Sequence, residues 1–298
     1  MSTLNRFLDR VDCFATEFTQ KDNSDRIWLA RRGVYLTTFI YFLMLLPRLK
    51  YFFGPESLRY GNGQLPDWFG WIVRLLFTEQ FQDYYLWFIV GLFVTIILGS
   101  LQPLVRIMSI LVYFFAENLF NKGEYITNGS ATVTSLLLIY FVFMSENKQP
   151  IFNQIFSYPN NLITNTAFLM AQLQICILYL VAGMSKLIGD EWLAGEAFYY
   201  TLNFAFFSQQ ALVNQLFKSD LVLYFSNYLA LGYQLTFAVL IWIKPLKKWL
   251  LFVGAGMHVG IIVLNGLVDF GLIMLASYLL FIDNSTAKRI RGIFPKII

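Results

Sequence analysis

Residues 171–200 read AQLQICILYLVAGMSKLIGDEWLAGEAFYY. An apolar run that could span a membrane ends within this stretch, at Lys186. Polar residues precede the lysine at steps of seven, at Tyr179, Gln172 and Asn165. Residues seven apart stay on nearly one face of a helix, and polar groups inside a membrane normally face a bundle interior or a water-filled cavity. We therefore expect a helix whose polar face leads to a site at Lys186.

A purely structural interpretation of these residues is also open. A lysine at the end of a membrane helix can extend its amine to the lipid head groups. A glutamine or tyrosine inside the helix can simply bond it to a neighbouring helix. The alignment of the polar residues, and the charged, glycine-containing segment 189–195 that follows, favour a site.

Composition predicts the class of protein. Of the 298 residues, 57% are hydrophobic and 13% are charged, and the mean hydropathy is +0.58. A soluble domain carries about 25% charged residues. The composition therefore predicts an all-α, polytopic helix bundle in a lipid bilayer. Basic residues lie in short loops and form no single patch, so no nucleic-acid partner is expected. One histidine and two separated cysteines predict no metal site.

About eight transmembrane helices are expected, with further interfacial amphipathic helices. Some of the apolar segments are shorter than the roughly 20 residues of a straight crossing, so they are tilted or re-entrant if they cross. We expect the spans near 27–46, 84–101, 104–120, 132–144, 162–184, 221–243, 249–264 and 267–282. The spacing of apolar residues over 4–18 predicts an amphipathic helix on the membrane or protein surface. This scheme divides the chain into an N-terminal segment, 1–25, a transmembrane domain, 26–283, and a basic tail, 284–298.

The basic residues predict the orientation. Counted on alternate sides of these spans, fifteen Lys and Arg lie on the side of the termini, six of them at the N-terminal end, and seven lie on the other side. Positive residues collect in cytoplasmic loops, so both termini are expected in the cytoplasm and Lys186 near the outer face. The outward connections, which are 47–83, the one that holds 124–130, and 183–220, could then cover a pocket at Lys186.

A second candidate group surrounds the single histidine, His258. Asn265 follows it by seven residues and Asp269 by a further four, so the three share a face if one helix continues through Gly266. Such a histidine is either a structural hydrogen-bond donor or a proton relay. In the same segment, Gly254 and two further glycines are typical of close helix packing.

Three stretches resemble the vitamin K-dependent γ-carboxylases and their bacterial relatives, the horizontally transferred transmembrane (HTTM) domain proteins. The first is the run from Tyr179 to Lys186, YLVAGMSK, followed by Asp190, Trp192 and Gly195. The second is YITNGS at 125–130, and the third is 258–281 with Asp269, Phe270 and Met274 within it. Together they extend the likeness over about 31–281 and imply a short bacterial-type member in the inner membrane.

The resemblance implies a site and a cofactor. The carboxylase lysine that matches Lys186 deprotonates a reduced lipid quinone, whose reaction with oxygen then generates a strong base. On this basis Lys186 and His258 are the candidate catalytic residues, and a reduced lipid quinone is the implied cofactor. The candidate substrate-binding residues are Asn128, Gln172, Tyr179, Trp192 and Asp269.

Two departures argue against full carboxylation of peptide glutamate. Gly129 and Ser130 follow Asn128 where the carboxylases have a histidine, and the chain ends shortly after the last expected span, without a large lumenal domain. An alternative is an accessory membrane factor for the maturation or release of a secreted antimicrobial peptide, as in sporulation-delaying systems, with no redox cofactor. A solute channel would need a polar path through both leaflets, and the sequence shows polar residues leading to one side.

Overall fold

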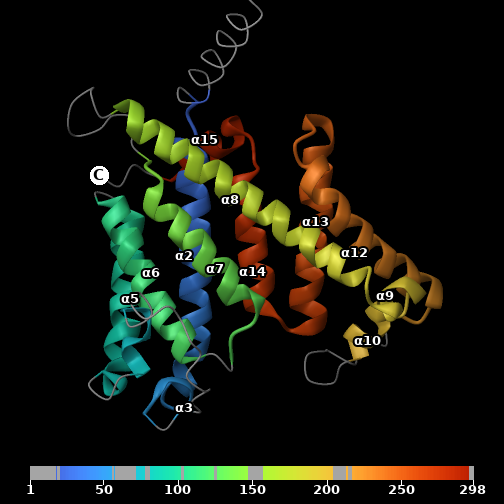
Figure 1. The fold of residues 1–298 in the computed structure, drawn as a ribbon, viewed down its shortest axis with the longest axis horizontal. Coiled ribbons are helices and arrows are strands. Elements are labelled where there is room, and N and C mark those ends of the chain that lie inside the picture. Colours follow the sequence, from blue (N-terminus) through green and yellow to red (C-terminus); the bar gives the residue numbers. More distant parts are fainter. Residues whose placement is uncertain are drawn as a thin grey trace, which may run out of the picture. The chain divides into compact units, whose positions relative to one another are not determined.

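A computed structural model describes residues 18, 21–55, 57, 72–77, 81–101, 104–123, 126–146, 157–203, 213 and 217–294. Every regular element in these ranges is a helix (Figure 1), which confirms the all-α prediction. The expected amphipathic helix at 4–18 lies outside the described residues, apart from Phe18.

Eight of the helices coincide with the eight apolar segments expected from the sequence. They are α2 (Ser24–Leu45), α5 (Tyr85–Leu101), α6 (Val105–Lys122), α7 (Gly129–Phe143), α8 (Ser157–Lys186), α12 (Asp220–Leu240), α13 (Lys244–Asn265) and α14 (Val268–Ser277). Shorter helices connect them: η1 (Leu46–Arg48), α3 (Leu49–Phe53), η2 (Ile72–Phe77), η3 (Gln82–Tyr84), α9 (Asp190–Ala194), α10 (Ala197–Asn203), η6 (Tyr278–Leu280) and α15 (Asn284–Ile293).

Fewer than eight of these helices have the length and composition of a membrane crossing. Among the described residues, Ser24–Phe53, Gln82–Leu101, Asn160–Lys186 and Lys244–Asn265 qualify, and a bent pair that includes α14 makes a fifth if it is one span. α7 has 15 residues, which at 1.5 Å per residue cover about 22 Å, whereas the hydrocarbon core is about 30 Å thick. The structure therefore supports a membrane protein with four or five candidate spans, and it does not support the expected number of about eight.

The chain forms two compact units. The N-terminal unit comprises 1–171 with 282–298, and the C-terminal unit comprises 172–281. α8 contributes its first half to one unit and its second half to the other. The transmembrane domain expected at 26–283 therefore contains residues of both units.

A buried ion cluster holds the N-terminal unit together. Arg31 and Glu146 are 2.8 Å apart, and both side chains are 0% exposed. Arg31 also donates to the carbonyl groups of Phe141 and Met144 at the end of α7. Arg32 bonds to Glu146 and to a backbone carbonyl of α5. Because the last carbonyl groups of a helix lack partners within it, these arginines join α2 to the C-terminal ends of α5 and α7.

This cluster corrects one part of the charge count. The six basic residues counted at the N-terminal end include Arg31 and Arg32, which lie inside the expected span near 27–46 and inside α2. The pairing with Glu146 explains why charged groups are tolerated there, since a buried charge is stable only when it is paired and hydrogen-bonded. Without these two residues the side of the termini still carries more Lys and Arg than the other side.

In the C-terminal unit, α12, α13 and α14 follow one another with short connections, and α13 packs against both of its neighbours (Figure 1). Gly266 ends α13 with a φ of +69°, in the left-handed region that glycine adopts at little cost. The helix that carries His258 therefore stops before Asp269, and the two residues lie on different helices.

Candidate functional site

A buried hydrogen-bonded network lies inside the C-terminal unit. The Tyr179 hydroxyl of α8 is 2.7 Å from Nε2 of His258 on α13 and 2.5 Å from the Tyr278 hydroxyl of η6. Tyr278 is in turn 2.8 Å from the Tyr233 hydroxyl of α12, which donates to the carbonyl oxygen of Leu250. All four side chains are buried. We refer to Tyr179, His258, Tyr278 and Tyr233 as the tyrosine–histidine network.

Gly254 makes room for this network. It is one turn before His258 on α13. A Cβ atom at this position would overlap the hydroxyl oxygens of both Tyr233 and Tyr278. The expectation of close packing is confirmed for Gly254, where a pair of polar groups approaches, and is wrong for Gly256 and Gly260, where a Cβ atom would meet no other atom of the described residues within 4 Å.

The direction of the hydrogen bonds follows from the chemistry of the groups. The Leu250 carbonyl can only accept, so the single proton of Tyr233 points to it. Tyr278 must then donate to Tyr233, and Tyr179 must donate to Tyr278, because each hydroxyl has one proton. Nε2 of His258 is left as the donor to Tyr179. In a neutral imidazole Nδ1 is then an acceptor.

Nδ1 of His258 is the basic end of the network. It is buried and has no hydrogen-bond partner among the described residues. A buried acceptor without a partner costs about 1–3 kcal/mol. The network therefore holds an imidazole in one tautomer with its basic nitrogen unused, which is an arrangement that can accept a proton or a hydrogen bond from a hydroxyl group.

Lys186 lies two helical turns beyond Tyr179 on α8. Its Nζ is 3.4 Å from the Ala182 carbonyl oxygen and 4.9 Å from the centre of the Trp192 ring on α9. The amine is partly buried, and no carboxylate in the described part of the chain is within ion-pair distance of it. The structure thus brings two of the candidate residues, Lys186 and Trp192, into contact through a cation–π interaction.

Three other candidate residues lie outside the tyrosine–histidine network. Asn128 caps α7 in the N-terminal unit, where its side chain accepts from the backbone N–H of Ser130 at 2.7 Å. Gln172 donates to the Leu280 carbonyl oxygen at 2.8 Å. Asp269 is in the first turn of α14, where a carboxylate is stabilised by the helix dipole. None of these three belongs to the tyrosine–histidine network.

Two members of the network, Tyr233 and Tyr278, were not candidates from the sequence. Each is a tyrosine within an apolar segment, which is a weak signal because tyrosine is common in such segments. Their bonds to other tyrosines of the network join positions 45 and 99 residues apart along the chain, so only the packing of the helices shows the connection.

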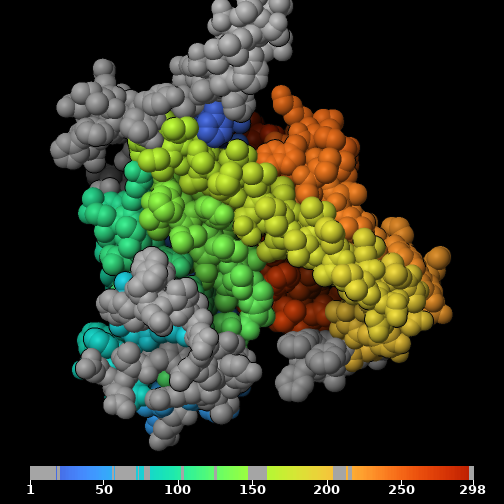
Figure 2. Space-filling view, in the orientation of Figure 1, coloured from blue at the N-terminus to red at the C-terminus, as the bar shows by residue number. Residues whose placement is uncertain are grey.

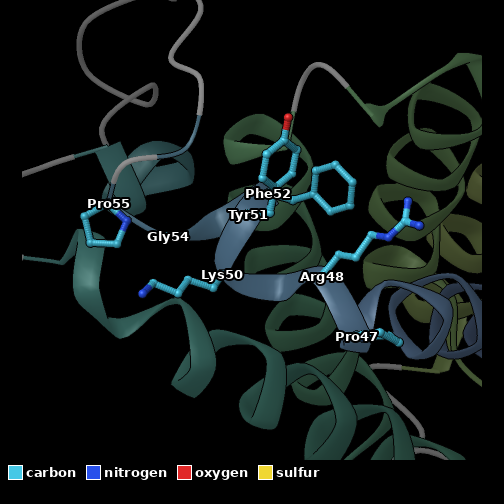
Figure 3. A pocket seen from close by; sticks show the side chains of 7 residues that line it. All are labelled: Pro47, Arg48, Lys50, Tyr51, Phe52, Gly54 and Pro55. Carbon is cyan, nitrogen blue, oxygen red and sulfur yellow. The ribbon is translucent and has the colours of Figure 1, made fainter.

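A large cavity in the N-terminal unit involves none of the candidate residues. It has a volume of about 1050 Å³ and is lined by residues of η1, α3 and the turn after them, within 47–55. Figure 3 shows the side chains of Arg48 and Lys50 pointing in opposite directions, so their charges do not converge on one ligand position. Lys186 lines neither this cavity nor the smaller one described below.

Comparisons of the chain with protein-family models, curated proteins and solved structures found no match.

Proposed function

We propose that this chain is an integral membrane protein similar to the HTTM and γ-carboxylase-like proteins, whose C-terminal unit performs acid–base chemistry on a lipid-soluble hydroxyl compound such as a reduced quinone. One observation supports this most. Tyr179 belongs to the first stretch that carries the resemblance and His258 opens the third, and a 2.7 Å hydrogen bond joins them in a buried network.

Nδ1 of His258 is the proposed proton acceptor. Its lone pair is buried and unused, which fits a ligand with a hydroxyl donor. A bound reduced quinone would supply an acidic phenolic O–H. When His258 takes up a proton at Nδ1, its Nε2–H remains bonded to the Tyr179 oxygen, which stabilises the imidazolium.

Lys186 has a supporting role in this proposal, as a second base or as a positive charge. Its position against the Trp192 ring keeps the amine partly out of water, and electrostatic attraction is stronger in such surroundings than in bulk water. The amine would therefore stabilise negative charge that develops on a bound molecule. The proposal ends at proton transfer and includes no carboxylation of peptide glutamate, because Gly129 and Ser130 stand in place of the carboxylase histidine.

The proposal includes a topology. The chain crosses a bacterial inner membrane eight times, with both termini in the cytoplasm and Lys186 near the outer face. This topology is supported by the coincidence of eight helices with the eight apolar segments and by the larger number of basic residues on the side of the termini.

Quinone content tests the proposal. We would purify the full chain in a mild detergent, extract the bound lipids and measure quinone per chain by mass spectrometry. The wild type should retain about one quinone per chain. The quinone content of His258→Gln and of Lys186→Ala should be lower by at least about tenfold, which corresponds to the loss of a charge-assisted contact of about 1.5–3 kcal/mol. Lys218→Ala, an exposed lysine of the same unit, is the matched control and should behave as the wild type.

Two outcomes would contradict the proposal. The first is a wild-type protein with no quinone. The second is an equal quinone content in all four proteins, which would show adventitious extraction from the membrane. Either would favour the accessory role in peptide maturation.

A further inference from the structure

A second cavity in the C-terminal unit has the chemistry of a cation site. Its volume is about 320 Å³. The lining residues come from the α9–α10 connection, α10 and the start of α12: Gly195, Glu196, Tyr199, Tyr200, Asp220, Leu223 and Tyr224. No member of the tyrosine–histidine network is among them. Figure 2 shows α9 and α10, in yellow, at the surface of the molecule.

Among the residues that the structure describes, the lining combines two carboxylates with three phenol rings and includes no basic side chain. The rings of Tyr199 and Tyr200 are 5.6 Å apart and nearly perpendicular, at 72°. The Tyr200 hydroxyl donates to Glu196 at 3.3 Å, and the nearby Glu196 carboxylate raises the pKa of the Tyr200 phenol. Neutral aromatic faces beside carboxylates are the surroundings in which proteins bind alkylammonium groups.

Two hydrogen bonds of a buried asparagine hold the two sides of the cavity together. Asn227 of α12 is fully buried; it donates to the Trp192 carbonyl oxygen at 3.0 Å and accepts from the Phe198 N–H at 3.1 Å. Gly195 has a φ of +85°, and a Cβ atom there would overlap the Tyr224 ring. The connection between α9 and α10 is therefore fixed against α12 before any ligand arrives, which lowers the entropic cost of binding.

The surface beside the cavity indicates which kind of molecule the bound cation belongs to. Leu221 and Phe225 are four residues apart on α12 and share one face of the helix, and Leu221 is also three residues from Tyr224, so this apolar face adjoins the cavity lining at Tyr224. They are 77% and 67% exposed. Apolar side chains next to tyrosines are typical of the membrane interface. A ligand with a charged head and apolar chains would cover both parts of this surface.

We propose that this cavity binds the ammonium group of a zwitterionic phospholipid head group, choline or ethanolamine, with the acyl chains along Leu221 and Phe225. The volume suits one head group. This inference is independent of the proposed quinone chemistry.

Lipid titration of the delipidated full chain, followed by native mass spectrometry, tests the inference. The probes are phosphatidylcholine, phosphatidylethanolamine and phosphatidylglycerol, the last of which lacks an ammonium group. The first two should bind more tightly than phosphatidylglycerol. Tyr200→Leu and Glu196→Gln should each weaken them by about two- to fivefold, as for loss of one exposed cation contact.

Matched variants separate the chemistry from a general loss of structure. Tyr200→Phe keeps the aromatic ring and should bind as the wild type. Asp190→Asn removes an exposed carboxylate of α9 that does not line the cavity, and it should also bind as the wild type. Quinone content should be unchanged in all of these proteins, so a failure here is distinguishable from a failure of the proposed function.

Three results would overturn the inference. They are equal binding of phosphatidylglycerol, wild-type affinity in both Tyr200→Leu and Glu196→Gln, and Glu196-dependent binding of free choline or of tetralysine with no phospholipid preference. The last result would assign the cavity to a soluble cation or to a basic peptide.

Discussion

At the scale of single residues, the largest stability effect should come from Glu146. Its carboxylate compensates Arg31 and Arg32, and it is 0% exposed. Glu146→Gln leaves buried positive charge without its partner, and we expect a loss of about 3–5 kcal/mol in the free energy of unfolding. Thermal unfolding in detergent would measure it. Asp25→Asn is the control, because the pair Asp25–Arg291 is partly exposed and should contribute about 0–1 kcal/mol. Equal effects of the two variants would show that the cluster is not buried as described.

The tautomer of His258 is a second prediction at this scale. The chain has one histidine, so labelling with ¹⁵N-histidine gives the signals of that ring alone. We expect a protonated Nε2 and an unprotonated Nδ1 at neutral pH, because the hydrogen bonds run in one direction from Nε2 to the Leu250 carbonyl. Tyr179→Phe removes the acceptor of the Nε2 proton and should produce a mixture of tautomers. Tyr199→Phe, outside the network, should leave the spectrum unchanged. A protonated Nδ1 in the wild type would contradict the assigned order.

At the scale of secondary structure, α7 provides the clearest test of a cap against a ligand-binding role. Asn128 is the N-cap of this helix and accepts from the Ser130 N–H. Asn128→Ala should reduce stability by about 0.5–2 kcal/mol, and Asn128→Ser should retain most of it because serine caps equally well. If Asn128 is only a cap, Asn128→Ser should also keep the wild-type quinone content. Loss of quinone in a stable Asn128→Ser protein would instead support the substrate-binding role that the resemblance implies.

At the scale of the whole molecule, the proposal of eight crossings predicts that α12 crosses the membrane. α12 has 21 residues, and its length of about 31 Å matches the hydrocarbon thickness. In a background with Cys13 and Cys176 replaced by serine, Lys218→Cys should react with a membrane-impermeant thiol reagent in intact cells. Lys248→Cys should react only after permeabilisation. Labelling of both from the same side would show that α12 does not cross, and it would contradict the proposal of eight crossings.

Much of the helical architecture was accessible from the sequence. The eight apolar segments were predicted within a few residues of the helices observed, because length and hydropathy are properties of contiguous residues. The cap at Asn128 was also readable in principle, since an asparagine directly before an apolar helical run is a known start signal. The resemblance assigns Asn128 to substrate binding, and the two roles are separated by the Asn128→Ser variant.

The buried polar contacts were only partly predictable from the sequence. Tyr179 and His258 were both candidates, but the hydrogen bond between them joins positions 79 residues apart, and the bonds of Tyr278 and Glu146 join positions 99 and 115 residues apart. Such pairings depend on which helix faces meet, and no local pattern encodes that. Hydropathy along the chain thus specified the helices, whereas the packing of those helices selected which polar side chains meet. The reason is that a buried donor or acceptor must find its partner wherever the chain brings one, because no water is there to replace it.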